Sequence, residues 1–299
     1  MRIVSLVPHA TELLFALGLG EDIVGVTHEC DYPEAAREIQ PVTHDVLAPG
    51  LSAAEIDSAV RERSERGDSI YELDEELLRE LEPELIVTQA LCTVCAVSHD
   101  EVQAVAVSMP EPPHVISLDP KTFGETLGDV HTIAQLTGTK DAALDLIART
   151  ARRADIIRLA VRDVPRPRVA ALEWLDPIFV AGHWTPQLIE MAGGEDVFGL
   201  AGEPSRVATW EEVAAAQPEV VIVMPCGYDA ARALVEAEEF ADRLRTLGAD
   251  HVVAVNASAY FSRPGPRLID GLELLAHILH PDRVPQAPAE ALAVELGQS

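Results

Sequence analysis

Histidine and cysteine side chains in the first third of the chain have the chemistry of metal ligands. The sequence contains His28-Glu29-Cys30 and, further on, Cys92-Thr93-Val94-Cys95, and both segments follow runs typical of buried β-strands. Imidazole nitrogen and thiolate sulfur suit zinc and iron. His28, Cys30, Cys92 and Cys95 are therefore candidates for a zinc or iron site, although the set offers one CxxC and one HxC rather than two close pairs.

The same thiols admit other interpretations. Four cysteines, of which Cys226 is the last, are too few for a disulfide scaffold in 299 residues, and in a reducing compartment they are ordinary buried thiols. Alternatively, Cys92 or Cys95 is the nucleophile of a thiol redox enzyme, or the His/Cys cluster belongs to a metal-sensing protein. The chain shows no phosphate-binding glycine loop, nucleophile elbow or pair of catalytic carboxylates, so we expect no enzymatic activity.

Aromatic residues make up only 4% of the chain, yet many of them follow predicted strands. Aromatic faces stack on conjugated rings at low entropic cost, so a wide, flat ligand is expected. The predicted ligand-binding residues are His9, Tyr32, Trp174, Phe179, His183, Trp184, Tyr228, Tyr260, Phe261 and Arg263.

Each of these residues also has a structural interpretation. An aromatic side chain after a strand is more often part of the core than a ligand contact. His9 and His183 are equally compatible with capping the helices that follow them. In the rigid turn Arg263-Pro264-Gly265-Pro266-Arg267, Arg267 is as compatible with a structural role as Arg263 is with a functional one.

An internal repeat indicates how these residues are positioned. The segment from His9 through Gly20-Glu21-Asp22 to Gly25 matches the segment from His183 to Gly199, 174 residues later. A second match, at a shift of 135, pairs Pro83-Glu84 with Pro218-Glu219, and a third pairs His114 with His251. The change in shift places an insertion near residues 35–70. Three collinear matches predict two homologous lobes.

Within each lobe, short apolar runs alternate with helical patterns, which predicts α/β architecture: two Rossmann-like, doubly wound lobes. In the first lobe the expected elements are Arg2–Val7, Ala10–Leu17, Ile23–Val26, Glu75–Leu81 and Leu85–Thr88. The apolar spacing after Gly138 predicts one rigid helix of about 20–25 residues between the lobes. The predicted division is residues 1–120, a linking region 121–164, and residues 165–299.

In open α/β sheets, ligands bind beyond the carboxyl ends of the strands. Two such lobes on a rigid connecting helix are expected to bring those ends face to face. The predicted site is therefore a cleft between the lobes.

The composition restricts the partners. The formal net charge is −28, with 20 Arg and 2 Lys among 50 acidic residues. Nucleic acid is a poor partner, because phosphate binding needs clustered basic side chains. No apolar run is long enough to insert into a membrane, and the first residues show no signal segment. We expect a monomeric cytoplasmic protein, or an extracytoplasmic one if a leader has been removed.

Several motifs together resemble the vitamin B12 and iron-chelate substrate-binding proteins of ABC importers. They are Ser5-Leu6-Val7-Pro8-His9-Ala10-Thr11-Glu12, Gly182-His183-Trp184-Thr185-Pro186 to Gly193-Gly194, and Tyr260-Phe261-Ser262-Arg263-Pro264-Gly265-Pro266-Arg267 with Asp270-Gly271. The resemblance covers nearly the whole chain apart from residues 35–70 and the tail after 282.

This resemblance implies two helix-bridged lobes that capture a corrinoid (cobalamin-like) ligand for uptake or intracellular handling, with an iron chelate as the related alternative. It also implies an ABC permease as partner, docked through an acidic residue on each lobe. By motif position these residues are Glu76 and Glu211. The alternative is that both carboxylates merely favour the first turn of a helix. The cysteines then acquire one further role, as thiolate ligands to the cobalt or iron of a bound ligand.

The acidic, lysine-poor composition predicts adaptation to molar salt. Like charges repel in the folded state, and screening shortens the Debye length from about 10 Å at 0.1 M to about 3 Å at 1 M salt. We expect the thermal midpoint of unfolding to rise between low and molar KCl, as followed by circular dichroism. A midpoint that does not rise would contradict this adaptation.

Overall fold

The structure is a computed structural model that describes residues 1–47, 51, 53–66, 70–90, 97, 99–285 and 290–296. The chain forms two compact units. The first comprises Met1–Pro120 and Leu127–Leu146, and the second comprises Lys121–Thr126 and Ile147–Ser299. Both units are α/β, as predicted.

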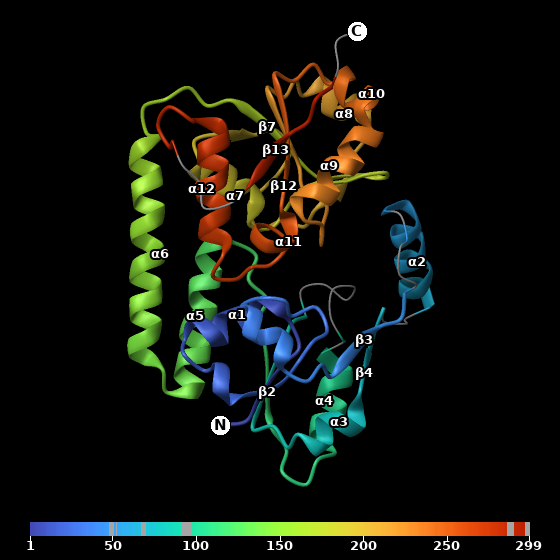
Figure 1. Ribbon diagram of the computed structural model, residues 1–299, viewed down its shortest axis with the longest axis vertical. Coiled ribbons are helices and arrows are strands. Elements are labelled where there is room, and N and C mark those ends of the chain that lie inside the picture. The colour runs from blue at the N-terminus through green and yellow to red at the C-terminus, as the bar shows by residue number, and fades with distance from the viewer. Residues whose placement is uncertain are drawn as a thin grey trace. The chain divides into compact units, whose positions relative to one another are not determined.

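The first unit is built on a four-stranded parallel sheet in the order β2-β1-β5-β6. Its strands are β1 (Ile3–Ser5), β2 (Ile23–Val26), β5 (Leu85–Thr88) and β6 (His114–Ser117). Strand β5 is buried along its whole length, because apolar side chains pack against both of its faces. Helices α1 (Pro8–Ala16), α3 (Glu75–Glu80) and α4 (His99–Val107) surround this sheet (Figure 1).

The predicted insertion contains a small hairpin and a helix. Strand β3 (Thr43–Asp45) pairs antiparallel with β4 (Tyr71–Leu73), and α2 (Ala53–Arg66) lies between them in sequence. Short 3-10 helices, η1 (Gly20–Asp22) and η2 (Glu34–Glu38), flank β2 in sequence. Helix α2 is rich in Glu, Asp and Arg. The β3–β4 hairpin was not predicted.

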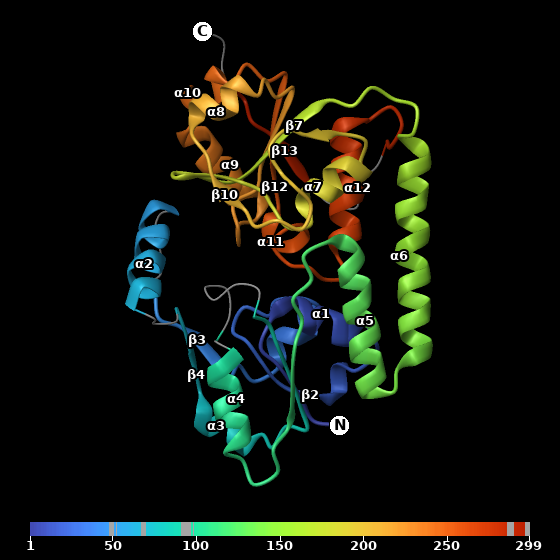
Figure 2. The same ribbon diagram turned by 180° about the vertical axis from the view of Figure 1, so that it is seen from behind.

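The second unit has a mixed sheet in the order β10-β8-β7-β11-β12-β13, with β9 also paired to β7. Its strands are β7 (Arg168–Leu175), β8 (Ile178–Val180), β9 (Glu195–Asp196), β10 (Arg206–Val207), β11 (Val220–Val223), β12 (His251–Val255) and β13 (Ala291–Ala293). Its helices are α7 (Thr185–Met191), α8 (Trp210–Ala215), α9 (Ala230–Glu239), α10 (Ala241–Thr246), α11 (Ala257–Tyr260) and α12 (Leu268–Leu279). Helices α7 and α12 lie on one side of this sheet and α9 and α10 on the other (Figures 1 and 2).

The region between residues 121 and 164 forms two helices, α5 (Phe123–Thr137) and α6 (Lys140–Ala160). Gly138, with a φ of +76°, separates them in the left-handed conformation that glycine adopts at low cost. Helix α6 has 21 residues and confirms the predicted long helix. Within the second unit, Arg153 of α6 contacts Glu273 of α12 at 2.8 Å and Asp270 at 2.5 Å, which fixes these two helices together.

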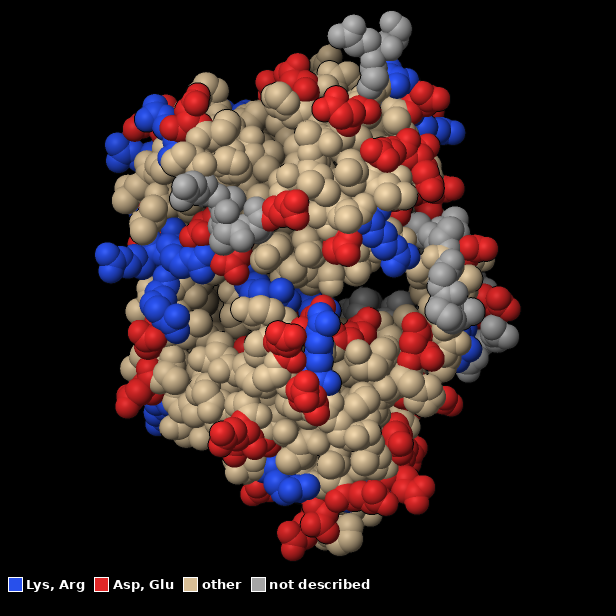
Figure 3. All heavy atoms as spheres, viewed as in Figure 1, with Lys and Arg blue, Asp and Glu red and all other residues tan. Residues whose placement is uncertain are grey.

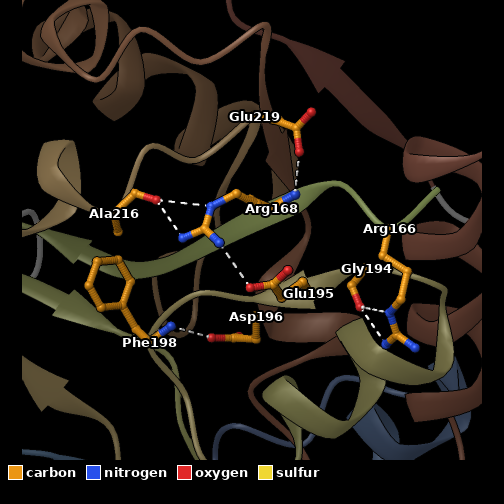
Figure 4. Close-up of polar contacts among 8 residues, drawn as sticks. All are labelled: Arg166, Arg168, Gly194, Glu195, Asp196, Phe198, Ala216 and Glu219. Atoms are coloured by element: carbon orange, nitrogen blue, oxygen red, sulfur yellow. Dashed lines mark hydrogen bonds and ion pairs between the residues drawn. The ribbon is translucent and has the colours of Figure 1, made fainter.

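The repeat is visible in equivalent hydrogen bonds within each of the two units. In the first unit, Arg2 donates its backbone N–H to the Glu84 carboxylate at 2.7 Å and its Nε–H to the carbonyl of Leu81 at 2.7 Å. In the second, Arg168 donates its backbone N–H to Glu219 at 2.8 Å and its guanidinium to the carbonyl of Ala216 at 2.8 Å (Figure 4). The second-half acceptors lie 135 residues after the first-half ones, which is the shift found in the sequence.

The units differ beside their first strands. Strand β2 pairs with β1 over three positions, whereas its counterpart β9 pairs with β7 only at Arg168 and Val169. The rest of that edge of β7 is occupied by β8, which returns in a hairpin from residue 178 and pairs as far as Leu172. Arg166, whose guanidinium binds the carbonyl of Gly194 at 2.6 Å, holds the chain just before β9 (Figure 4). Along β7, the edge equivalent to the one that β2 takes along β1 is therefore shared between β8 and the two-residue β9.

Candidate functional site

In the first unit, the loop after β2 is held by a network of hydroxyl groups. Thr43 of β3 donates to Thr27 at 2.9 Å and contacts both the backbone nitrogen of His28, at 3.1 Å, and its Nδ1, at 2.8 Å. Tyr71 of β4 donates to Glu29 at 2.8 Å. The inserted hairpin is thus fastened to the loop that follows a central strand. Because parallel strands present their carboxyl ends at one edge, this loop belongs to the candidate site.

Cys30 closes the same loop and is buried. Its sulfur lies 3.0 Å from Thr11 Oγ1, which also donates to Ser5 at 2.8 Å. In the part of the chain that the structure describes, no three His, Cys, Asp or Glu residues are grouped so as to hold a metal ion. Cys92 and Cys95 lie outside the described residues, so the four-residue metal site stays a prediction.

The ends of β5 and β6 are joined through Asp119. Its carboxylate accepts from the backbone N–H of Ala90 and from the hydroxyl of Ser117, the latter at 2.6 Å. Thr88 and Gln89 at the end of β5 are buried polar residues. Burial of polar groups is costly unless they are paired, and the Thr88 hydroxyl has no hydrogen-bond partner among the described residues.

His9 and Tyr32, the predicted ligand contacts of this unit, lie in different surroundings. His9 is buried in the first turn of α1, and this helix has Val7 at its N-cap and no side-chain cap. His9 therefore does not cap the helix. Tyr32 is 47% exposed and follows the His28–Cys30 loop. Whether either residue contacts a ligand stays a prediction.

In the second unit, β7 and β8 form an aromatic hairpin. Trp174 and Phe179 are directly opposite each other in its register and are both half-buried. The Trp174 ring meets Tyr228 edge to face, with centroids 5.6 Å apart. Trp174 was predicted to follow a strand, but β7 continues through it because β8 supplies the hydrogen-bonding partner. Two aromatic side chains are thus held on a rigid hairpin rather than on a loop.

Tyr228 is buried in the core of this unit and packs against Trp174. The Arg232 guanidinium lies over its ring at 3.7 Å and donates to its hydroxyl at 3.0 Å. Burial raises the pKa of Tyr228, and the nearby Glu236 carboxylate adds to this effect. Glu236 is itself buried, and its pKa is raised chiefly by burial, against the opposing hydrogen bond from Tyr228.

His183 occupies a strained position beyond β8. Its φ is +53°, a left-handed conformation that non-glycine residues rarely adopt. The conformation is enforced by hydrogen bonds from His183 N to the Glu203 carbonyl, at 2.6 Å, and from Gly202 N to the His183 carbonyl, at 2.9 Å. Burial and the nearby Lys121 cation lower the pKa of His183 and favour the neutral imidazole. Helix α7 has Trp184 at its N-cap and no side-chain cap, so His183 does not cap it either.

Trp184 and Phe261 are buried and packed together. Trp184 donates its indole N–H to the Phe261 carbonyl at 2.7 Å, and the His183 ring lies 5.5 Å from the Trp184 ring. Tyr260 is half-buried at the end of α11, with the Arg267 guanidinium 5.8 Å from its ring. Arg263, also half-buried, lies in the turn before α12. Trp184 and Phe261 are thus buried, whereas His183, Tyr260 and Arg263 are partly accessible.

Glu76 and Glu211 have the same local setting in the two units. Each is exposed at the second residue of a short helix, α3 or α8, whose first turn is capped by Asp74 or Thr209. Their neighbours Glu75 and Glu212 form ion pairs with arginines, at 2.7 Å in both cases. Neither Glu76 nor Glu211 forms an ion pair with a described residue. Their equivalence agrees with the repeat. It is compatible both with docking to a permease and with stabilisation of the first turn of a helix.

The chain thus combines two α/β units, each with polar and aromatic residues that follow its parallel strands. A family model described as periplasmic binding protein matches residues 3–257. The chain therefore belongs to the periplasmic binding protein family, and it is a binding protein, not an enzyme.

Curated relatives and solved structures agree with this assignment. The vitamin B12-binding protein of Vibrio cholerae serotype O1 is 24% identical over 288 residues, covering 91% of this chain and 86% of the relative. The solved periplasmic vitamin B12 binding protein BtuF of Vibrio cholerae is 22% identical, with a TM-score of 0.66 over 95% of this chain and 98% of that one. The periplasmic haem-binding protein RhuT from Roseiflexus sp. RS-1 is 22% identical, with a TM-score of 0.69 and the same coverage. At these identities the solved structures show the fold alone.

The comparisons give no support to the cytoplasmic expectation, because these solved relatives are described as periplasmic. Across the described residues, none of the helices combines the length and apolar character needed to span a membrane.

The buried Glu236 carboxylate predicts a pH dependence of stability. Its pKa is raised in the folded protein, so the folded state binds the proton more tightly than the unfolded chain does. Its contribution is therefore fully present below the unfolded pKa, near 4.5, and is lost as the pH rises through the folded pKa. We expect Glu236→Gln to reduce this decline and to raise stability at neutral pH, as measured by urea unfolding across the pH range. Glu238→Gln, on the exposed face of the same helix, is the control, and coincident Glu236→Gln and wild-type profiles would contradict the prediction.

Proposed function

We propose that this protein captures a corrinoid of the cobalamin type and delivers it to an ABC importer. The observation that carries the proposal is the set of aromatic side chains on and around the β7–β8 hairpin, with Trp174 and Phe179 paired across it and Tyr228 packed edge-on behind. A wide conjugated ring is the ligand that such a surface favours. The B12-binding names of the curated relatives support the same class.

Haem is the second candidate ligand. Solved proteins of the same fold bind haem, including the periplasmic haem-binding protein HutB of Vibrio cholerae, at 20% identity and a TM-score of 0.68. Corrinoids and haem share a flat macrocycle with a central metal, and the aromatic hairpin suits both. The second unit also offers His183, whose lowered pKa keeps a neutral imidazole available at neutral pH. A metal ion bound directly by His28 and the cysteines remains a separate proposal.

Delivery to a permease is proposed to use Glu76 and Glu211. Both carboxylates are exposed, stand at equivalent places in the two units and are not engaged by a described basic side chain. Basic side chains are scarce on a surface where acidic side chains predominate (Figure 3). An arginine-bearing partner surface would therefore meet little repulsion from this protein.

The ligand assignment is tested by titration with hydroxocobalamin, cobinamide, ferric haem and an iron chelate, followed by tryptophan fluorescence and gel filtration. We expect a corrinoid to co-elute as a red complex. Trp174→Ala should weaken binding roughly two- to twelvefold, because one lost aromatic contact costs roughly 0.5–1.5 kcal/mol. Trp210→Ala, in the same unit and stacked on Phe240, is the matched control. Retention of haem alone would reassign the ligand, and retention of no macrocycle, with one stoichiometric zinc or iron ion by elemental analysis, would refute the function.

Docking is tested by charge reversal. In cells that depend on this protein for corrinoid uptake, Glu76→Arg and Glu211→Arg should each lower the uptake rate roughly tenfold or more, because like charges placed together cost several kcal/mol. Their ligand Kd should stay at the wild-type value. Glu80→Arg, exposed on the same helix as Glu76, is the control. Normal uptake by both charge-reversed variants would show that the two residues have only a structural role.

A further inference from the structure

The imidazole of His28 is anchored to a single hydroxyl group. Thr43 Oγ1 lies 3.1 Å from the backbone nitrogen of His28 and 2.8 Å from its ring Nδ1. Thr43 gives its own proton to Thr27 Oγ1 at 2.9 Å. Both threonines are buried, so water does not compete for these contacts.

This arrangement decides which ring nitrogen of His28 carries a proton. A threonine hydroxyl has one proton to donate and two lone pairs that accept. The proton of Thr43 is used by Thr27, so Thr43 must accept from both the backbone N–H and the Nδ1 of His28. The proton therefore sits on Nδ1, and the lone pair of the neutral ring is on Nε2.

Nε2 is the nitrogen that the loop leaves available. His28 is exposed, and its described contacts engage Nδ1, the backbone and the face of the ring, but not Nε2. The Tyr71 ring packs beside it with centroids 5.1 Å apart, and the hydrogen bond from Tyr71 to Glu29 keeps that ring in place. His44 differs, because its Nε2 is engaged by Glu72 at 2.7 Å. The loop after β2 thus presents one oriented nitrogen lone pair at the carboxyl edge of the sheet.

We propose that His28, through Nε2, is an axial ligand to the metal of a macrocycle bound at the carboxyl end of the first sheet. The proposal rests on the function proposed above. Imidazole nitrogen is a common ligand of iron and suits other transition metals, cobalt among them. A partner on the opposite ring nitrogen fixes the tautomer and the ring orientation and makes the ligating nitrogen more basic. In the binding step the Nε2 lone pair forms the bond to the metal, one water leaves the metal, and the ring loses no proton.

In this proposal the inserted β3–β4 hairpin orients the imidazole of His28. Thr43 and Tyr71 come from its two strands, and both act on His28 or its neighbour. They are positioning residues, because they reach the metal only through the imidazole.

The first test is spectroscopic and uses ferric haem and hydroxocobalamin as probes. Wild-type complexes should show absorption spectra of imidazole-ligated metal, and His28→Ala should return the water-ligated spectrum and weaken binding about tenfold or more. Free imidazole added to the His28→Ala complex should restore the wild-type spectrum. His44→Ala should resemble the wild type. An unchanged spectrum in His28→Ala, with the macrocycle still bound, would overturn the ligation and leave the proposed function intact.

The second test needs no ligand. In protein labelled with ¹⁵N-histidine, long-range ¹H–¹⁵N NMR correlations should show the proton of His28 on Nδ1. Thr43→Val should give a mixture of tautomers, and Thr43→Ser, which keeps the hydroxyl, should restore the single one. A wild-type His28 protonated on Nε2 would refute the inference whatever the protein binds. Failure of the wild type to bind any macrocycle, with the Nδ1 tautomer observed, would instead refute the proposed function and with it the ligation.

Discussion

The start of the first strand in each unit is held by one arginine and one glutamate, which align it with the neighbouring parallel strand. Each arginine binds a glutamate carboxylate that lies just before the neighbouring parallel strand, β5 or β11. Each also binds a carbonyl at the end of the helix that leads into that strand, α3 or α8. These contacts fix the register of neighbouring parallel strands at their amino ends. Because the parallel strands run in one direction from this aligned start, their following loops emerge along one edge, where ligands bind in open α/β sheets.

The two units have similar folds but different side-chain arrangements after their strands. The first has a hydroxyl network that orients an imidazole, built from buried threonines and an inserted hairpin. The second has an aromatic hairpin supported by a buried tyrosine, arginine and glutamate. One unit is therefore suited to directional contact with a polar or metal centre, and the other to broad contact with a flat face.

Much of the fold could be predicted because its signals are local or repeated. The strands over residues 23–26 and 85–88 lie where short apolar runs placed them, and the long helix after Gly138 follows from its spacing. The contacts of Thr43 with His28 could not be predicted, since they join residues brought together only by a hairpin of weak propensity. Trp174 was expected to follow a strand, whereas it lies within one. Its strand is extended by pairing with β8, and no local sequence pattern reveals that pairing. Burial of Tyr228 and Phe261 depends on packing in three dimensions, which spacing alone does not give.

The described part of the second sheet ends in a short strand on each side. With β8 and β10 added on one side and β13 on the other, the outermost strands are only two and three residues long. A short outer strand exposes few unpaired backbone groups, so it offers a poor template for a strand from another molecule. On the β10 side the charged pair of Arg206 with Glu212 adds a further obstacle. These short outer strands thereby disfavour edge-to-edge aggregation of this unit.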